Sequence, residues 1–337
     1  MEEKILIVNV NWVGDALFST PFIRSLRQAY PRSYIACLLH PRCREVLEGN
    51  PRIDEIIIYD EEGVHRSLIG KIRLILTLRK KRFDAAFLLH RSFTKALIAV
   101  LSGAKRRIGY ATKNRRFLLT DVVEEPLEPI HKVGYFLNIA RTAGIAGDDK
   151  AYEFFVGEAD REYAGRFLNE NGIQAEDGFA AINPGGNWAP KRWPKENFAG
   201  LADRLISDYG LKVVITGAGK DIRLAEDIKK LMKSSPVIAC GKTTLKQLAA
   251  LFERSRLVVA NDTGPMHIAC AMGANVIALF GPTSPEITGP IGKGAYKVIH
   301  NPAGCEVPCY DLNCAVNRCM EAIRVEDVLK EVKERLV

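Results

Sequence analysis

Short apolar runs of the kind that form buried strands alternate with longer helical stretches along the whole chain. The first run covers residues 4–10 and leads into a helical stretch at 16–29, and the same alternation begins again at residue 179. Because parallel strands need a long crossover, usually a helix, this alternation is typical of parallel sheets covered by helices on both faces. The sequence therefore predicts an α/β chain with doubly wound sheets. We expect strands at 4–10, 34–39, 55–59, 84–89, 179–183, 211–216, 256–260 and 275–280.

A length of 337 residues is enough for two domains of ordinary size. A glycine- and acid-rich connection at 144–150 precedes the second series of strands, and we place the division just after it, giving domains 1–156 and 157–337. Open α/β sheets bind ligands at the carboxyl ends of their strands. We therefore predict two Rossmann-like domains that face each other across a cleft, with binding loops after the first strand of each.

The positive charge is concentrated in the first half of the chain. The net charge is +8, of which residues 1–156 carry +7, and residues 65–116 hold 15 basic residues and one acid, Asp84. Such a concentration of positive charge favours an anionic partner: nucleic acid, anionic lipid headgroups or a phosphorylated acceptor. Solvated helix faces would explain some of these residues but not the near absence of acids. Because no RNP-like motif or interleaved aromatic stripe accompanies them, we do not expect a nucleic-acid partner.

No apolar run reaches the roughly 18 residues that a membrane-spanning helix needs. The N-terminal Met-Glu-Glu-Lys leads directly into the first strand and lacks the charged-then-apolar layout of a signal peptide. We therefore expect a cytoplasmic protein that can contact a membrane surface.

The loop after the first strand, residues 11–15, reads Asn-Trp-Val-Gly-Asp. A dinucleotide-binding loop would carry three glycines here, whereas this loop has only Gly14, so a dinucleotide cofactor is not expected. Asp15 has two interpretations. It is an N-cap of the following helix, which the spacing alone favours, or a general base held within reach of an acceptor hydroxyl.

The loop after the strand at 179–183 contains two glycines, two asparagines and the adjacent cations Lys191 and Arg192. It could hold a diphosphate, with Lys191 as a point charge. The alternative is a long turn anchored in the core by Trp188 and Trp193.

The segment 261–267, Asn-Asp-Thr-Gly-Pro-Met-His, joins an apolar strand to an apolar helix. Free backbone N–H groups and the helix dipole at such a junction can hold a phosphate. His267 lies one turn into the helix, on about the same side as Thr263. The alternative is a capped turn, with Asp262 or Thr263 as N-cap and His267 packed in the core; this segment alone does not decide between them.

Four of the eight cysteines lie within a short stretch, at Cys305, Cys309, Cys314 and Cys319. Their spacing matches no standard zinc or iron–sulfur pattern, although four thiolates could hold either. A structural metal or a redox-sensitive cluster is one interpretation, and reduced thiols in a compact loop are the other. Disulfides are not expected in a reducing cytoplasm. With no Asp-x-Asp pair in the chain, a catalytic divalent metal of that type lacks its ligands.

Read together, four segments occur in a characteristic order: residues 11–15 with Thr20-Pro21, then 191–194, 261–267 and 280–285. This set resembles the ADP-heptose:lipopolysaccharide heptosyltransferases. The Asn-Trp-Val-Gly-Asp loop and the Met before His267 are most similar to the heptosyltransferase II branch.

The resemblance implies a GT-B type glycosyltransferase that moves heptose from ADP-heptose to a heptose hydroxyl of the lipopolysaccharide inner core. It implies inversion, without a metal or other cofactor, with the acceptor in the N-terminal half and the donor in the C-terminal half. By position, Asp15 matches the general base and Lys191 the residue that steadies the leaving diphosphate. The implied donor-binding residues are Gly14, Asn187, Asp262, Thr263, Gly264 and His267.

The implied acceptor is a phosphorylated, lipid-linked oligosaccharide at the inner face of the cytoplasmic membrane, so we expect a monomer peripherally associated with that membrane. The nearest alternative is a relative that uses another nucleotide sugar or acceptor. An iron–sulfur redox protein built on the four cysteines, and a nucleotide-sugar-binding protein without activity, are alternatives of other classes. Where an acidic ribose contact is expected, residues 217–221 read Gly-Ala-Gly-Lys-Asp, and Asp221 or Glu226 is the candidate substitute.

Overall fold

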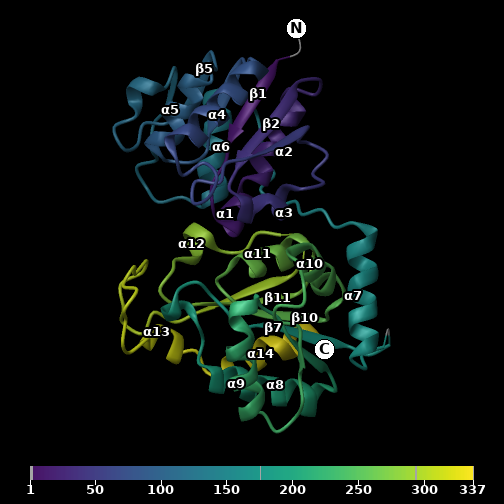
Figure 1. Cartoon of the computed structure of the whole chain (residues 1–337). Coiled ribbons are helices and arrows are strands. Elements are labelled where there is room, and N and C mark those ends of the chain that lie inside the picture. Colours follow the sequence, from purple (N-terminus) through teal and green to yellow (C-terminus); the bar gives the residue numbers. More distant parts are fainter. Residues whose placement is uncertain (1–2, 175, 293, 337) are drawn as a thin grey trace. The chain divides into compact units, whose positions relative to one another are not determined.

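The computed structural model of the chain describes residues 3–174, 176–292 and 294–336. The chain divides into two compact units, residues 1–155 and 156–337. Among the described residues, each unit is built on a six-stranded sheet, and every strand pairing is parallel (Figure 1).

The sheet of the N-terminal unit has the order β3-β2-β1-β4-β5-β6. From β1 the chain builds outward through β2 to β3, and it then returns to add β4 on the other side of β1. The topological switch point therefore lies between the carboxyl ends of β1 and β4. The strands are β1 Lys4–Val8, β2 Tyr34–Leu39, β3 Glu55–Ile58, β4 Ala85–Leu88, β5 Arg106–Tyr110 and β6 Asp121–Val123.

Helices cover both faces of this sheet. Leu74 of α4 and Ala96 of α5 pack in one core with Leu6 and Val8 of β1, while α2 and α6 contact each other elsewhere in the unit. The helices are α1 Val13–Phe18, α2 Thr20–Ala29, α3 Arg44–Leu47, α4 Leu68–Lys81, α5 Phe93–Leu101 and α6 Lys132–Thr142, with 3-10 turns η1 Pro41–Cys43 and η2 Arg116–Leu118.

The helix predicted at 16–29 is instead two helices, which meet at Ser19. Pro21 lies in the first turn of α2, where its missing N–H is tolerated. The hydroxyl of Thr20 donates to the carbonyl of Leu17 at 2.7 Å, which gives that carbonyl the hydrogen bond that Pro21 cannot supply.

The C-terminal unit repeats the same topology, with the order β12-β11-β10-β7-β8-β9, so its switch point lies between β7 and β10. The strands are β7 Phe179–Asn183, β8 Lys212–Ile215, β9 Val237–Ile238, β10 Leu257–Asn261, β11 Val276–Phe280 and β12 Tyr296–His300. The helices are α7 Glu158–Glu170, α8 Lys195–Tyr209, α9 Ile222–Leu231, α10 Leu245–Arg254, α11 Gly264–Ala271, α12 Pro285–Thr288, α13 Arg318–Glu321 and α14 Val325–Leu336, with 3-10 turns η3 Ala189–Lys191 and η4 Gly219–Asp221.

Candidate active site

The loops after β7 and β10 meet at the switch point of the C-terminal unit, because these two strands are neighbours in the sheet. In open α/β sheets the crevice outside the carboxyl ends of the strands at the switch point is the usual ligand site. The loop after β7 contains Lys191. The segment from Asp262 to His267 follows β10, and its last four residues form the start of α11. The two segments singled out in the sequence are therefore brought together by the fold.

Asp262 is the centre of this group. It is 5% exposed, and its Oδ2 accepts hydrogen bonds from Lys191 Nζ at 2.6 Å and from Thr283 Oγ1 at 2.7 Å. The Nε2 atom of His267, which is buried too, lies 3.8 Å from Oδ1. Burial by itself raises the pKa of Asp262, but the imidazole of His267 and the charge of Lys191 outweigh burial and lower that pKa to about 2. Asp262 is therefore a carboxylate that holds Lys191 in place.

Lys191 ends η3 and keeps a partly exposed side chain, 19% accessible. Its Nζ also lies 5.0 Å from the centre of the Trp188 ring. Trp193 anchors the loop: it is buried, its ring N–H donates to Ile323 O at 2.8 Å, and its backbone N–H donates to Asn261 Oδ1. Trp193 thus has the core role suggested for both tryptophans, whereas Trp188 is only half-buried and lies beside the lysine.

Helix α11 begins directly after Asp262. Its N-cap is Thr263, which is extended and makes no side-chain capping hydrogen bond; the hydroxyl donates back to Asn261 O at 3.2 Å. Pro265 in the first turn lacks an N–H. The N-terminus of α11 therefore directly follows the carboxylate that binds Lys191. The lysine charge together with the positive end of the helix dipole is suited to an anion such as a diphosphate.

The loop after β7 also approaches the loop after β8. Asn187 is exposed, and its Oδ1 accepts from Lys220 Nζ at 2.5 Å. Asp221, a candidate ribose contact, is buried and accepts the N–H of Ala218. Gly185 packs against it so closely that a Cβ at this position would lie 2.8 Å from the Asp221 carboxylate.

In the N-terminal unit, Gly14 and Asp15 lie in α1, which follows the switch-point strand β1. The N-cap of α1 is Trp12, so the capping interpretation of Asp15 is wrong: Asp15 is in the first helical turn. The exposed ring of Trp12 lies under the guanidinium of Arg42, at 4.7 Å. Asp15 is half-buried.

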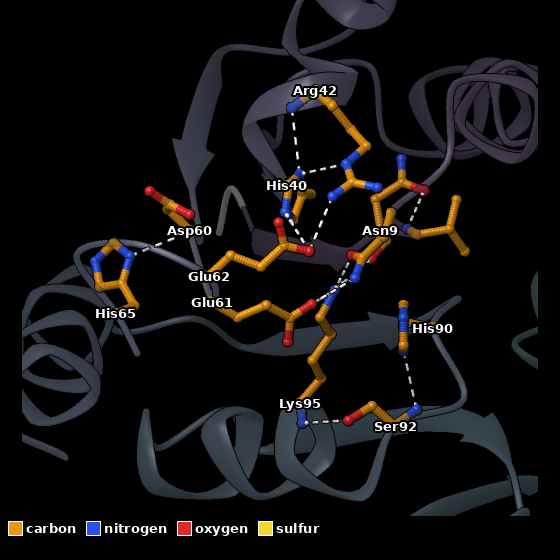
Figure 2. A network of polar contacts seen from close by, with 12 residues as sticks. Asn9, His40, Arg42, Asp60, Glu61, Glu62, His65, His90, Ser92 and Lys95 are labelled. Carbon is orange, nitrogen blue, oxygen red and sulfur yellow. Dashed lines mark hydrogen bonds and ion pairs between the residues drawn. The ribbon is translucent and has the colours of Figure 1, made fainter. Parts of the chain in front are cut away.

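A second polar cluster, which the sequence interpretation missed, occupies the switch point of this unit (Figure 2). Lys95 of α5 is 1% exposed; its Nζ donates to Asn11 Oδ1 and lies 3.5 Å from Asn9 O and 4.0 Å from Glu61 Oε1. Burial lowers the pKa of Lys95 to about 8, against the opposing effect of Glu61. A lone lysine inside an otherwise apolar helix was the available signal.

His90 and His40 border the same cluster. Burial, together with the charge of Lys95, lowers the pKa of His90 to about 3, and its Nδ1 accepts the N–H of Ser92 at 3.0 Å. Burial and the charge of Arg42 also lower the pKa of His40, whose Nδ1 accepts from Arg42. Both imidazoles are therefore neutral near pH 7.

The four clustered cysteines do not assemble. Cys305 is exposed and Cys319 is buried, and all four are free thiols. Within residues 3–174, 176–292 and 294–336, no three His, Cys, Asp or Glu side chains are gathered as a metal site requires. The structural metal considered from the sequence has no support in the structure.

Across the same residues, no helix combines the length and apolar character that crossing a bilayer requires.

The chain matches known proteins over most of its length. A family model described as Glycosyltransferase family 9 (heptosyltransferase) matches residues 71–318. Lipopolysaccharide heptosyltransferase 2 of Escherichia coli K12 is 30% identical over 305 residues, which cover 87% of this chain and 86% of the relative.

Two solved structures extend the likeness to the fold. A family 9 glycosyl transferase from Veillonella parvula superposes with a TM-score of 0.91 at 27% identity, over 100% of this chain and 98% of the other. E. coli ADP-heptose LPS heptosyltransferase II superposes with a TM-score of 0.81 at 28% identity, over 99% and 98%. The predicted α/β fold of the GT-B type is confirmed, and the iron–sulfur alternative is not favoured.

Proposed function

The chain belongs to glycosyltransferase family 9, the heptosyltransferases, and from that premise we propose that it transfers heptose from ADP-heptose to a heptose hydroxyl of the lipopolysaccharide inner core. The observation that carries the proposal is the Lys191–Asp262 pair at the N-terminus of α11, in a chain 30% identical to lipopolysaccharide heptosyltransferase 2. The predicted glycosyltransferase class is confirmed by the family match.

The C-terminal unit binds the donor. The diphosphate of the donor lies against Lys191 and the first turn of α11, where the lysine charge and the positive end of the helix dipole act together. As the bond between the sugar carbon and the diphosphate oxygen breaks, negative charge grows on the departing ADP. Lys191 and the helix dipole stabilise that charge, so no divalent metal is required. Asp262 holds Lys191, His267 and Thr283 in position, and Asn187 and Gly264 complete the donor contacts.

The N-terminal unit binds the acceptor, and Asp15 is the general base. The carboxylate takes the proton of the acceptor hydroxyl while that oxygen attacks the sugar carbon from the face opposite ADP, which inverts the configuration. Such proton transfer contributes about 10²- to 10⁴-fold to a rate. Gly14, which precedes Asp15 in α1, is a donor-binding residue in this proposal.

The acceptor is a phosphorylated oligosaccharide on a lipid anchor. We expect the enzyme to work in the cytoplasm, as a monomer at the inner face of the membrane, where this lipid-anchored substrate lies. The concentration of basic residues between 65 and 116 supports a membrane location, because these residues are attracted to phosphates and anionic headgroups.

The experiment is a donor-specificity assay. The full chain is incubated with ADP-heptose, and separately with other nucleotide sugars, on a heptose-bearing acceptor in the presence of EDTA. We expect transfer from ADP-heptose alone, with inverted anomeric configuration in the product. Transfer only from another nucleotide sugar would establish a different donor, and transfer abolished by EDTA would overturn the metal-independent mechanism. In the same assay Lys191→Ala should lose transfer, whereas the control Lys229→Ala, on the exposed side of α9, should keep it.

A further inference from the structure

Helix α4 is apolar on the side that faces the solvent. Leu68, Ile69, Ile72 and Leu76 are 73%, 64%, 45% and 52% exposed, and their spacing places them on one side of the helix. The opposite side carries Leu74 and Leu78, which are buried in the core of the N-terminal unit. A surface helix normally turns a polar face outward, so the apolar outer face of α4 needs a partner.

The apolar surface continues on α5. Phe93, Leu97 and Leu101 follow one another at intervals of four residues and are 39%, 37% and 45% exposed. Phe117, 75% exposed, lies beside Phe93 with ring centres 6.0 Å apart. Helices α4 and α5 contact each other and pack on the same core, so the two exposed rows lie on neighbouring helices of the N-terminal unit.

Cations border this surface without neutralising partners. Arg66, Arg73, Arg79 and Lys80 are exposed, and among the described residues no carboxylate forms an ion pair with any of them. Lys81, at the more buried side of α4, is paired with Glu55 at 2.5 Å. The only acid between 65 and 116, Asp84, pairs with Lys105 at 2.8 Å. The surface is therefore apolar along its middle and positively charged at its border.

We propose that this α4–α5 face, formed by Leu68, Ile69, Ile72, Leu76, Phe93, Leu97, Leu101 and Phe117 with Arg66, Arg73, Arg79 and Lys80, docks on the surface of an anionic lipid bilayer. The helices lie in the headgroup plane, with the apolar residues at the acyl boundary and the cations on lipid phosphates. The inference rests on the proposed function for the lipid-anchored acceptor, and it adds which surface faces the membrane.

Charge complementarity favours a bilayer over a second copy of the chain. A two-fold dimer through this face would bring the same patch of each copy together, and so would oppose unpaired cations. An anionic membrane instead offers an apolar interior to the apolar middle of this face and a layer of phosphates to the cations at its border. Attraction of this kind weakens as salt rises, because exposed charges are screened over about 8 Å at physiological ionic strength.

The test is co-sedimentation of the full chain with vesicles of phosphatidylcholine, with or without phosphatidylglycerol. We expect binding to the phosphatidylglycerol vesicles that weakens with salt, and little binding to phosphatidylcholine alone. Arg73→Gln/Arg79→Gln/Lys80→Gln should lower the affinity by about 100-fold, since each cation near the surface contributes about 5-fold. Leu68→Ser/Ile72→Ser/Leu76→Ser should lower it at least as much, because it removes the inserted residues.

The matched control is Lys212→Gln/Lys229→Gln/Lys233→Gln, which removes the same charge from exposed positions of the C-terminal unit. It should bind vesicles like the unmodified chain. All three variants should transfer heptose to a delipidated, water-soluble acceptor at the unmodified rate, which shows that they are folded.

Three results would overturn the assignment: no binding of the unmodified chain to phosphatidylglycerol vesicles, equal loss in the control, or a dimer that the serine variant dissolves. A failure of the proposed function is seen separately, as absent transfer to the soluble acceptor while vesicle binding persists.

Discussion

Lys191 and Asp262, 71 residues apart in the chain, form an ion pair with Nζ 2.6 Å from Oδ2. The sheet topology causes this contact, because the strands preceding the two loops are neighbours at the switch point. The pair joins the two segments that carry the strongest sequence signals, and it sets the electrostatics of the proposed donor site.

Lys191→Ala should weaken binding of ADP and slow transfer. A hydrogen bond to a charged group contributes about 1.5–3 kcal/mol, so we expect ADP affinity to fall by about 10- to 100-fold. Isothermal titration with ADP measures the loss. Lys229→Ala should leave ADP affinity unchanged, and ADP binding by Lys191→Ala at the unmodified affinity would remove Lys191 from the donor site.

Asp15→Asn should separate chemistry from donor binding. The amide cannot accept the acceptor proton, so kcat should fall by about 10²- to 10⁴-fold. ADP affinity should stay unchanged, because this substitution leaves Lys191, Asp262 and the first turn of α11 unaltered. Single-turnover transfer and ADP titration give the two quantities; a variant with full activity would contradict the base assignment.

Asp262 should make the stability of the chain depend on pH in acid. The pKa of Asp262 is about 2 in the folded chain, against 3.8 for an unperturbed aspartate. Because the folded-state pKa is lowered, the stabilisation is complete above pH about 4 and is lost as pH falls through about 2, a change of about 2 kcal/mol. Urea unfolding between pH 5 and 2 should show this slope, and Asp262→Asn should reduce it.

Lys95 should make the stability of the chain rise with pH in alkali, because its buried cation costs stability at neutral pH. Its pKa falls from 10.5 to about 8 on folding, so the folded chain binds fewer protons between these values. The burial of the cation then costs stability below pH about 8, and this cost disappears as pH rises to about 10.5. The difference in unfolding free energy between the unmodified chain and Lys95→Met should rise over this interval. The difference is needed because buried thiols, such as Cys37, lower stability as pH rises.

Gly185→Ala and Gly200→Ala should change stability in opposite directions. The new methyl at 185 would lie 2.8 Å from the buried Asp221 carboxylate, and such overpacking costs about 1–3 kcal/mol. At position 200, inside α8, the methyl would meet only Val325 Cγ2 at 3.8 Å. Alanine there should stabilise the helix by up to about 1 kcal/mol. Urea midpoints of both variants, at pH 7, measure the two effects.

The central strands could be predicted because parallel strands buried on both faces read as continuous apolar runs. Strands β1, β7, β10 and β11 are of this kind. The apolar pattern does not predict β6, β9 or β12, which lie at sheet edges and are short or partly exposed. Strand β5 is not predicted either, because it begins with two arginines that are exposed or partly exposed and so is not a continuous apolar run.

The candidate site was predictable as separate loops but not as contacts. No periodicity relates Lys191 to Asp262, so only the strand order reveals that they pair. The charge pattern predicts that the basic residues of 65–116, Lys95 among them, face an anionic partner, whereas Lys95 is buried against Asn11. A cation count cannot distinguish a lysine that closes a polar cluster from one that faces solvent.

The carboxylate of Asp262 also bears on how quickly the spent nucleotide departs. When the donor arrives, its diphosphate competes for an ammonium that already has a partner 2.6 Å away, so the net gain in affinity is smaller than a bare lysine would give. An ammonium has three N–H groups, so Lys191 can donate to the carboxylate and to a phosphate oxygen at the same time. Because Asp262 neutralises part of the lysine charge, it weakens the binding of ADP as well as of the donor. We therefore expect ADP to leave faster than it would from an unpaired lysine.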